Sequence, residues 1–339
     1  RRQRQMCIRD RDMQEKFTLF SDMVVFSSYA MQVVMSFMML VMIFIMLPRA
    51  SVAAKRILEV LDTEPSIEDG TRDTFPVMKD GEVEFKDVSF KYPDAEEYVL
   101  EHISFSAKKG ETIAFIGATG CGKSTAINLI PRFYDATEGE VFVDGVNVKE
   151  YTQEALHNKI GYVSQKAILF SGTIADNVAY GENGKAPATQ DDIAMAVKVA
   201  QASEFVEKKD QGYDGYVAQG GSNFSGGQKQ RLSIARAIAK DPKIFIFDDS
   251  FSALDLKTDA ALRKALAENV KDSTVIIVAQ RISTILHAEQ ILVLDDGKVV
   301  GKGTHEELLR SCEVYQEIAK SQLSEKELGL KESEVADHE

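Results

Sequence analysis

The sequence is poor in the residues that build disulfide frameworks and zinc sites. Its 339 residues include three cysteines and five histidines, and neither set has the spacing of metal ligands. An odd number of scattered cysteines also indicates a reducing compartment rather than a secreted, disulfide-bonded fold. We therefore expect neither a disulfide nor a site built from these residues. They are Cys7, Cys121, Cys312, His102, His157, His287, His305 and His338.

Basic residues are fewer than acidic residues. Lys and Arg number 40 against 53 Asp and Glu, which gives a net charge of −13. This balance excludes a general nucleic-acid binder, because such a protein needs a basic surface. Apolar residues make up 44% and charged residues 27%, as in ordinary globular proteins, so a buried core is expected. The length allows about two domains.

Charge is absent altogether from Met23 to Leu47, where Met, Val, Phe, Ile and Leu prevail. Roughly 25 residues at about 1.5 Å rise give about 37 Å, enough to cross a hydrocarbon layer of about 30 Å. A signal peptide has a shorter apolar region and a cleavage site of small residues. A buried soluble helix of this length without polar relief is the less favoured interpretation. The stretch is therefore predicted to span a membrane.

A glycine-rich segment between an apolar run, 113–116, and a helix-compatible run, 126–130, matches the phosphate-loop pattern G-x-x-x-x-G-K-[ST]. Glycines let backbone N–H groups turn inward around an anion, and a following helix adds its positive N-terminal end. Lys123 can reach terminal phosphates and Ser124 can ligate Mg²⁺. The segment predicts a site for ATP and Mg²⁺. It comprises Gly117, Ala118, Thr119, Gly120, Cys121, Gly122, Lys123, Ser124 and Thr125.

Three further apolar runs, 244–247, 275–278 and 291–294, are predicted to be buried strands, since both of their faces are apolar. Helical patterns between them predict an α/β sheet with helices on both faces. Asp248 and Asp249 follow the first run. Because ligands of such sheets bind beyond the carboxyl ends of the strands, Asp248 and the phosphate loop are expected at the same edge.

The segment 166–235 is predicted to be mostly helical. Within it, Ser225-Gly226-Gly227-Gln228 begins a helix-compatible run, so Ser225 is a candidate N-cap and the turn a second phosphate-type site. One nucleotide cannot occupy two distant sites in one domain. We therefore expect a two-fold-like dimer in which each chain's turn completes its partner's site.

Upstream of the phosphate loop the pattern changes twice. Residues 50–62 are predicted to continue the apolar helix, and residues 64–81 to form a linker. Val83–Phe85 and Val88–Phe90 alternate as two short half-buried strands do. Tyr92 follows, and an aromatic ring there can stack on an adenine base, although most such tyrosines only pack.

These motifs resemble the ATP-binding half of an ATP-binding cassette (ABC) exporter, with the last membrane helix of its transport domain attached. The resemblance covers residues 17–320 and implies a P-loop NTPase domain of the α/β class. The implied parts are a foreign or truncated segment at 1–16, the transmembrane helix at 17–48, a cytosolic helix and linker at 49–80, the ATP-binding domain at 81–320 with its helical subdomain at 166–235, and a solvated acidic tail at 321–339.

The resemblance also implies individual roles. Gly117 to Thr125 corresponds to the Walker A loop. Gln165 corresponds to the glutamine loop, which touches Mg²⁺ and leads towards the membrane domain. Asp248 ends the Walker B strand and, with Ser124 and Gln165, is implied as a metal contact. Tyr92 corresponds to the aromatic residue that stacks on adenine.

The signature and the D-loop of this family are matched as well. Ser225, Gly226, Gly227 and Gln228 are intact, although Phe224 replaces the usual Leu. Residues 252–255, ending at Asp255, match the D-loop. In a dimer these residues would contact the nucleotide of the partner.

Two departures concern hydrolysis. After the Walker B Asp the family has Glu, which polarises the attacking water, whereas this chain has Asp249. The switch His before Arg281 is replaced by Gln280, which can donate a hydrogen bond but cannot become cationic. Losing a positioned base typically costs about 10²–10⁴-fold in rate. We therefore expect the chain's own Walker site to bind ATP through Lys123 and to hydrolyse it slowly.

This combination resembles the degenerate-site subunit of heterodimeric bacterial exporters, and it predicts a different partner chain with Glu and His at those positions. Drift in a homodimer that uses Asp as a weak base is the alternative. A purely regulatory ATP-binding subunit is a second alternative. A soluble cassette protein that acts on nucleic acid is disfavoured by the membrane helix and the acidic balance. A small, amphipathic exported substrate is implied.

The resemblance places the ATP-binding domain in the cytoplasm and the helix in a bacterial plasma membrane. Arg49, Lys55 and Arg56 follow the helix directly, as the positive-inside tendency expects. The arginines before the helix would then face outward. Because of this conflict and the lack of a Met at position 1, we expect a truncated chain whose residues 1–16 are foreign to the natural protein. A lone membrane helix cannot form a transport pathway, so we also expect that other helices of a multi-pass protein are missing.

Overall fold

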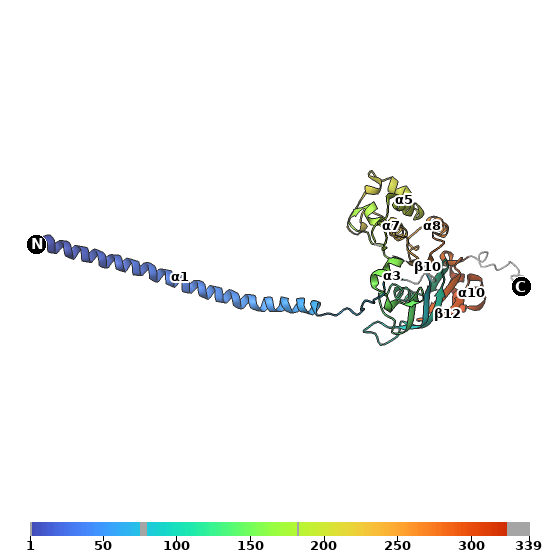
Figure 1. Ribbon diagram of the computed structural model, residues 1–339, viewed down its shortest axis with the longest axis horizontal. Coiled ribbons are helices and arrows are strands. Elements are labelled where there is room, and N and C mark those ends of the chain that lie inside the picture. Colours follow the sequence, from blue (N-terminus) through green and yellow to red (C-terminus); the bar gives the residue numbers. More distant parts are fainter. Residues whose placement is uncertain (1, 75–79, 182, 324–339) are drawn as a thin grey trace, which may run out of the picture. The chain divides into compact units, whose positions relative to one another are not determined.

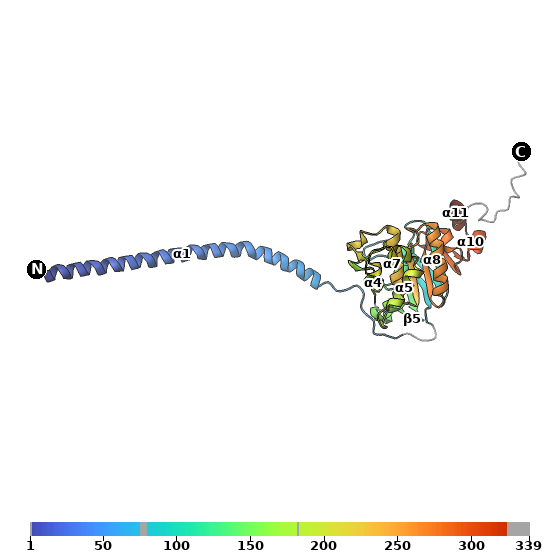
Figure 2. The ribbon, with the colours of Figure 1, turned by 90° about the horizontal axis from the view of Figure 1, so that it is seen from above.

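The computed structural model describes residues 2–74, 80–181 and 183–323. The chain divides into two compact units, Arg1–Ser66 and Ile67–Glu339. The first unit is a single helix, α1 (Arg2–Leu61), visible in Figure 1 and Figure 2. Its segment from Asp12 is long and apolar enough to cross a membrane, and its described side chains are exposed. The predicted apolar helix and its continuation to residue 61 are therefore present as one element.

The second unit is built around a six-stranded sheet in the order β12-β11-β3-β10-β9-β6. The strands from β11 to β6 are parallel, and β12 is antiparallel to β11. This is the α/β arrangement that the apolar runs predicted. The strands are β3 (Thr112–Gly117), β6 (Ile160–Val163), β9 (Ile244–Asp248), β10 (Thr274–Val278), β11 (Gln290–Asp295) and β12 (Lys298–Gly303).

This sheet separates two hydrophobic cores, because alternate residues of its central strands β3, β9, β10 and β11 enter opposite cores. Phe245 and Phe247 of β9 pack with the helices, whereas Ile244 and Ile246 pack with a second sheet and with α2 (Lys123–Asn128). All four side chains are at most 2% exposed. Burial on both faces explains why these strands are apolar at every position.

A second sheet is antiparallel and has the order β2-β1-β4-β5. Its strands are β1 (Val83–Phe90), β2 (Leu100–Ala107), β4 (Glu138–Val143) and β5 (Val146–Asn147). Two separate strands were expected within 83–90, and this expectation was wrong. The chain runs through as one strand, with Asp87 in the left-handed region at φ 51° and an irregular register around it. Such a bulge re-aims the strand without ending it.

The segment 166–235 is mostly helical, as predicted, and adds a short hairpin of β7 (Gly172–Thr173) and β8 (Tyr216–Val217). In Figure 1, α5 and α7 lie together at one end of this unit and β12 and α10 at the other. Its helices are α4 (Ile174–Val178), α5 (Gln190–Val199), α6 (Ser203–Glu207) and α7 (Gly226–Ala239).

The remaining helices connect strands of the two sheets or follow them. They are α2 (Lys123–Asn128), α3 (Gln153–Lys159), α8 (Leu256–Asn269), α9 (Ile282–Ile285), α10 (His305–Ser311) and α11 (Glu313–Gln322), with 3₁₀ turns at Val148–Glu150, Gly212–Asp214 and Gln219–Gly221. Residues 324–339, which include most of the expected tail, lie outside the described residues.

A buried charged cluster holds residues 80–82, which precede the first strand of this unit. Asp144, which is fully buried, accepts hydrogen bonds from the backbone of Gly81 (2.6 Å) and Glu82 (3.1 Å) and forms an ion pair with Lys159. Lys159 also bonds Asp80 at 2.8 Å. Burial raises the pKa of the Asp144 carboxyl, and the bonds from Lys159 and Gly81 oppose that rise. The cluster joins residues 80–82, β4 and α3.

We predict that Asp144→Ala lowers the free energy of unfolding by about 3 kcal/mol, because it removes one ion from a buried pair and leaves two buried N–H groups without an acceptor. Asp144→Asn is the matched control, since Asn tolerates the φ of 54° and keeps an acceptor for those groups. It should lose less than half as much. Urea unfolding of the detergent-solubilised chain measures both, and equal losses would contradict the role of the cluster.

Candidate nucleotide site

The predicted site residues gather at one edge of the six-stranded sheet. The phosphate loop follows β3, Gln165 follows β6, Asp248 is the last residue of β9 and Gln280 follows β10. These strands are parallel neighbours, so their carboxyl ends meet at the same edge. Residues from four separate parts of the sequence are thereby brought into hydrogen-bonding contact.

The phosphate loop has the conformation that its glycines permit. Gly120 and Gly122 have φ values of 88° and 96°, in the left-handed region. A Cβ atom added at Gly122 would lie 2.9 Å from Val99 O. A Cβ atom added at Gly120 would meet no other atom, because Gly120 faces open space. Glycine is therefore required at both positions for backbone geometry, and at Gly122 for close approach as well.

Lys123 turns back over this loop. Its Nζ donates to Gly117 O at 2.8 Å and Ala118 O at 2.6 Å, and lies 3.5 Å from Cys121 Sγ. The side chain is 9% exposed. A buried ammonium group bonded to neutral carbonyls keeps its full charge available for an anion, which suits the predicted contact with terminal phosphates.

Ser124 and Asp248 form the candidate metal side of the site. Ser124 Oγ donates to Asp248 Oδ1 at 2.7 Å, and Tyr162 OH donates to Asp248 Oδ2 at 3.4 Å and to Asn128 Oδ1 at 2.9 Å. Burial raises the pKa of the Asp248 carboxyl, against the lowering effect of these two bonds. A hydroxyl and a carboxylate are the hard oxygen donors that Mg²⁺ prefers, so the residues present fit that ion.

The described residues contain no cluster of three His, Cys, Asp or Glu side chains suited to a metal ion. The protein thus offers Mg²⁺ a partial ligand set, to which nucleotide phosphates and water would add the rest.

Asp249 is held between the two glutamines. Its Oδ2 accepts from Gln280 Nε2 at 2.6 Å and from Gln165 Nε2 at 3.1 Å. Its backbone lies in the left-handed region at φ 47°, a strained conformation of the kind found at functional sites. Burial raises the pKa of its carboxyl, against the lowering bonds from Gln165 and Ser252.

Tyr92 lies beside the loop. Its hydroxyl is 3.1 Å from Thr125 Oγ1, and its ring is edge-on to Phe90 at 5.0 Å and to Tyr134 at 5.3 Å. These contacts fix the ring next to the phosphate loop, where the adenine contact was expected. The sequence assigned no role to Tyr134, Tyr162 or Asn128, because none of them stands at a motif position.

The signature begins α7. Ser225 Oγ accepts from Gln228 N at 3.3 Å while Gln228 Oε1 accepts from Ser225 N at 3.0 Å, a reciprocal capping box. Gly226 faces open space. Phe224 is 6% exposed and packs against Phe205, so the helical subdomain accommodates the residue that departs from the family pattern.

The structure does not join this signature to the phosphate loop of the same chain by any hydrogen bond among the described residues. Gly227 instead lies against the D-loop, where a side chain would approach Ala253 O at 3.3 Å. Asp255 caps α8 by accepting from Thr258 N at 3.0 Å, a bond that lowers the pKa of its carboxyl. Arg281, which the sequence did not single out, holds Ser252 O and Leu254 O at 3.4 and 3.5 Å.

We predict that Asp248→Asn weakens binding of Mg·ATP by about tenfold or more, because it removes a carboxylate from the candidate metal site. Affinity for ATP in excess EDTA should change less than about twofold. Asp241→Asn is the control, since Asp241 is an exposed aspartate whose carboxylate bonds Lys185 and takes no part in the candidate metal site. Equilibrium binding of a fluorescent ATP analogue measures all three. Equal losses with and without Mg²⁺ would contradict a metal role for Asp248.

The comparisons with known proteins agree with this geometry. The family described as ABC transporter matches residues 100–252. An uncharacterised ABC transporter ATP-binding protein of Mycobacterium tuberculosis is 47% identical over 301 residues, covering 88% of this chain and 51% of that protein. The ATP-dependent lipid A-core flippase of Haemophilus influenzae is 42% identical over 276 residues, covering 81% and 46%.

A solved structure, a bacterial Atm1-family ABC exporter with ATP bound, superposes with a TM-score of 0.75 at 34% identity. The matched region covers 82% of this chain and 48% of the exporter chain. The chain thus spans about half the length of the curated relatives it matches. Sequence and structure agree on one assignment: the chain contains an ABC transporter ATP-binding domain, and over that domain it is similar to exporters of this family.

Proposed function

We propose that this chain is the ATP-binding part of an ABC exporter subunit, in which ATP binding and hydrolysis at a dimer interface drive export of a small amphipathic molecule across the bacterial plasma membrane. The observation that carries the proposal is that one chain holds two elements together. The phosphate loop, Asp248 and Asp249 meet at one edge of the six-stranded sheet, and α1 is apolar and long enough to cross a membrane. The ATP-binding domain lies in the cytoplasm, where ATP is available.

The chain's own residues bind and orient the nucleotide. Lys123 and the phosphate loop would hold the phosphates, Tyr92 would stack on the base, and Ser124, Asp248 and Gln165 would contact Mg²⁺. When bound, Mg²⁺ would neutralise phosphate charge. Asp249 orients the attacking water. The dimer brings the partner's signature to this site and this chain's Ser225–Gln228 turn to the partner's site.

Slow hydrolysis at the chain's own site follows from the residues around Asp249. Asp holds its carboxylate one C–C bond, roughly 1.5 Å, further back than Glu. Its Oδ2 is shared by two amide donors, and Gln280 cannot supply a positive charge. The first two features weaken the base and the third removes a cationic switch, whereas none of them removes a phosphate contact. A partner chain with Glu and His would then carry the faster site, with this chain's intact signature completing it.

The alternative is a homodimer that hydrolyses weakly, and a regulatory subunit that only binds ATP is a third candidate. One experiment separates them. We predict that Asp249→Glu combined with Gln280→His raises the single-turnover rate of ATP hydrolysis at least about tenfold. The Glu carboxylate extends one C–C bond further towards the water, and the His side chain can carry a positive charge. Mg·ATP affinity should stay within about twofold.

The measurement uses the membrane-embedded chain in excess over radiolabelled ATP. Lys123→Ala in the same doubly substituted background is the control, and it should abolish binding and rate together. Fast hydrolysis by the unmodified chain alone would refute the degenerate-site proposal and leave the homodimer. In vesicles with a co-purified partner, changing each chain's Walker lysine in turn would show which site drives uptake.

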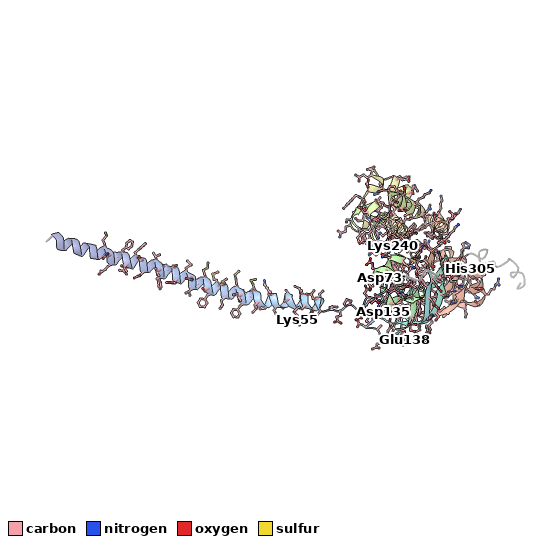
Figure 3. All side chains as sticks on the ribbon, viewed as in Figure 1. Lys55, Asp73, Asp135, Glu138, Lys240 and His305 are labelled. Carbon is pink, nitrogen blue, oxygen red and sulfur yellow. The ribbon has the colours of Figure 1, made fainter. Side chains whose placement is uncertain are left out.

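A surface beside β6, the strand that precedes Gln165, is suited to contact the membrane part of the exporter. A cavity of about 250 Å³ is lined by Tyr162, Phe133, Tyr180 and the two cations Arg236 and Lys240 (Lys240 in Figure 3). Burial lowers the pKa of both cations. Arg236 donates to Asn177 O and Ile168 O, and Lys240 donates to His157 O, so the partners observed for both are neutral. An acidic, partly apolar segment of the transport domain would add the missing counter-charge, and we propose it as the occupant.

We predict that Lys240→Met leaves Mg·ATP binding within about twofold but lowers substrate-stimulated hydrolysis several-fold in the assembled exporter, because it removes one of these two cations. Lys264→Met, at an exposed lysine of α8, is the control. Unchanged stimulation of hydrolysis by substrate in Lys240→Met would contradict a role of this cavity in contacting the transport domain.

A further inference from the structure

The loop that carries Gln280 is fastened by a residue far along the chain. Gln322, the last residue of α11, donates from Nε2 to Gln280 O at 2.8 Å and accepts from Ile282 N through Oε1 at 2.8 Å. One side-chain amide thus bonds two backbone groups that lie on either side of Arg281. We call this arrangement the Gln322 bracket.

The helix that presents Gln322 is firmly anchored. Tyr315 and Ala319 of α11 are fully buried in the helical core, and Tyr315 OH is 2.7 Å from His305 Nδ1. Gln322 itself is exposed, one turn beyond these anchors. An exposed amide contributes little to stability, because water can replace its hydrogen bonds. Its two bonds therefore control where the loop lies more than whether the domain folds.

The position of that loop decides what Gln280 touches. The same residue whose carbonyl Gln322 holds places its side-chain Nε2 2.6 Å from Asp249 Oδ2. Asp249 is the candidate water-orienting residue, so a shift of the Gln280 backbone by a fraction of an ångström would change this contact. The chain of contacts runs from α11 through Gln322 and Gln280 to Asp249.

We infer that Gln322 is a positioning residue for ATP hydrolysis, acting through the backbone of Gln280. The inference rests on the proposed function, because it needs Asp249 and Gln280 to act on ATP. It adds a residue outside every recognised motif. Neither pattern nor spacing in the sequence connects position 322 with position 280.

The test compares single-turnover hydrolysis and Mg·ATP affinity of the membrane-embedded chain with those of three variants. Gln322→Ala should lower the rate about five- to tenfold, the effect of losing about one kcal/mol of positioning, with affinity within about twofold. Gln322→Glu should lower it as well, since a carboxylate cannot donate to Gln280 O. Gln316→Ala should not, because Gln316 lies on the same helix but bonds Leu309 O.

A second comparison distinguishes positioning from a structural role. Gln280→Ala keeps the carbonyl that Gln322 holds but removes the side chain that it positions. In this background Gln322→Ala should change the rate less than about twofold. A further five- to tenfold loss there, or no loss in the parent chain, would overturn the inference. Failure of the parent to bind Mg·ATP would instead overturn the proposed function, so the two failures have separate readouts.

Discussion

The structure depends on a sheet that is buried on both faces. Strands β3, β9 and β10 are apolar at almost every position because alternate side chains enter two different cores. A strand of this kind can place a polar or charged group only where it ends. Every parallel strand points the same way, so the ends collect the phosphate loop, Asp248, Gln165 and Gln280 at one edge. The chemistry of the site is a consequence of this packing.

Charge at that edge is incompletely balanced within the chain. Lys123 is bonded to carbonyl oxygens rather than to a carboxylate, and burial raises the pKa of the Asp248 and Asp249 carboxyls. Buried charges are stable only when they are paired or hydrogen-bonded. A triphosphate with Mg²⁺ would supply an anion for Lys123 and a cation for Asp248 together. The residues at this edge therefore fit the pair of ligands that we propose.

The sequence predicted well what depends on local pattern. The phosphate loop, the apolar strands, the capping role of Ser225 and the long apolar helix each occupy a short contiguous segment, and each is present where expected. It failed at Asp87, where a bulge continues β1, because a single left-handed residue leaves no mark on the alternation of apolar positions. It also missed Tyr162, Arg281 and Gln322, whose partners are tens of residues away along the chain.

The departures at Asp249 and Gln280 are best understood as a pair. A Glu at position 249 would extend its carboxylate past the two glutamine amides, whereas the shorter Asp leaves its Oδ2 within reach of both. A cationic His at position 280 would hold the carboxylate by charge, and a neutral Gln holds it by one hydrogen bond. Either change alone leaves a partner mismatched in length or charge. Together they place two neutral amide donors on one oxygen of a single carboxylate, and this is the arrangement on which the proposed slow hydrolysis rests.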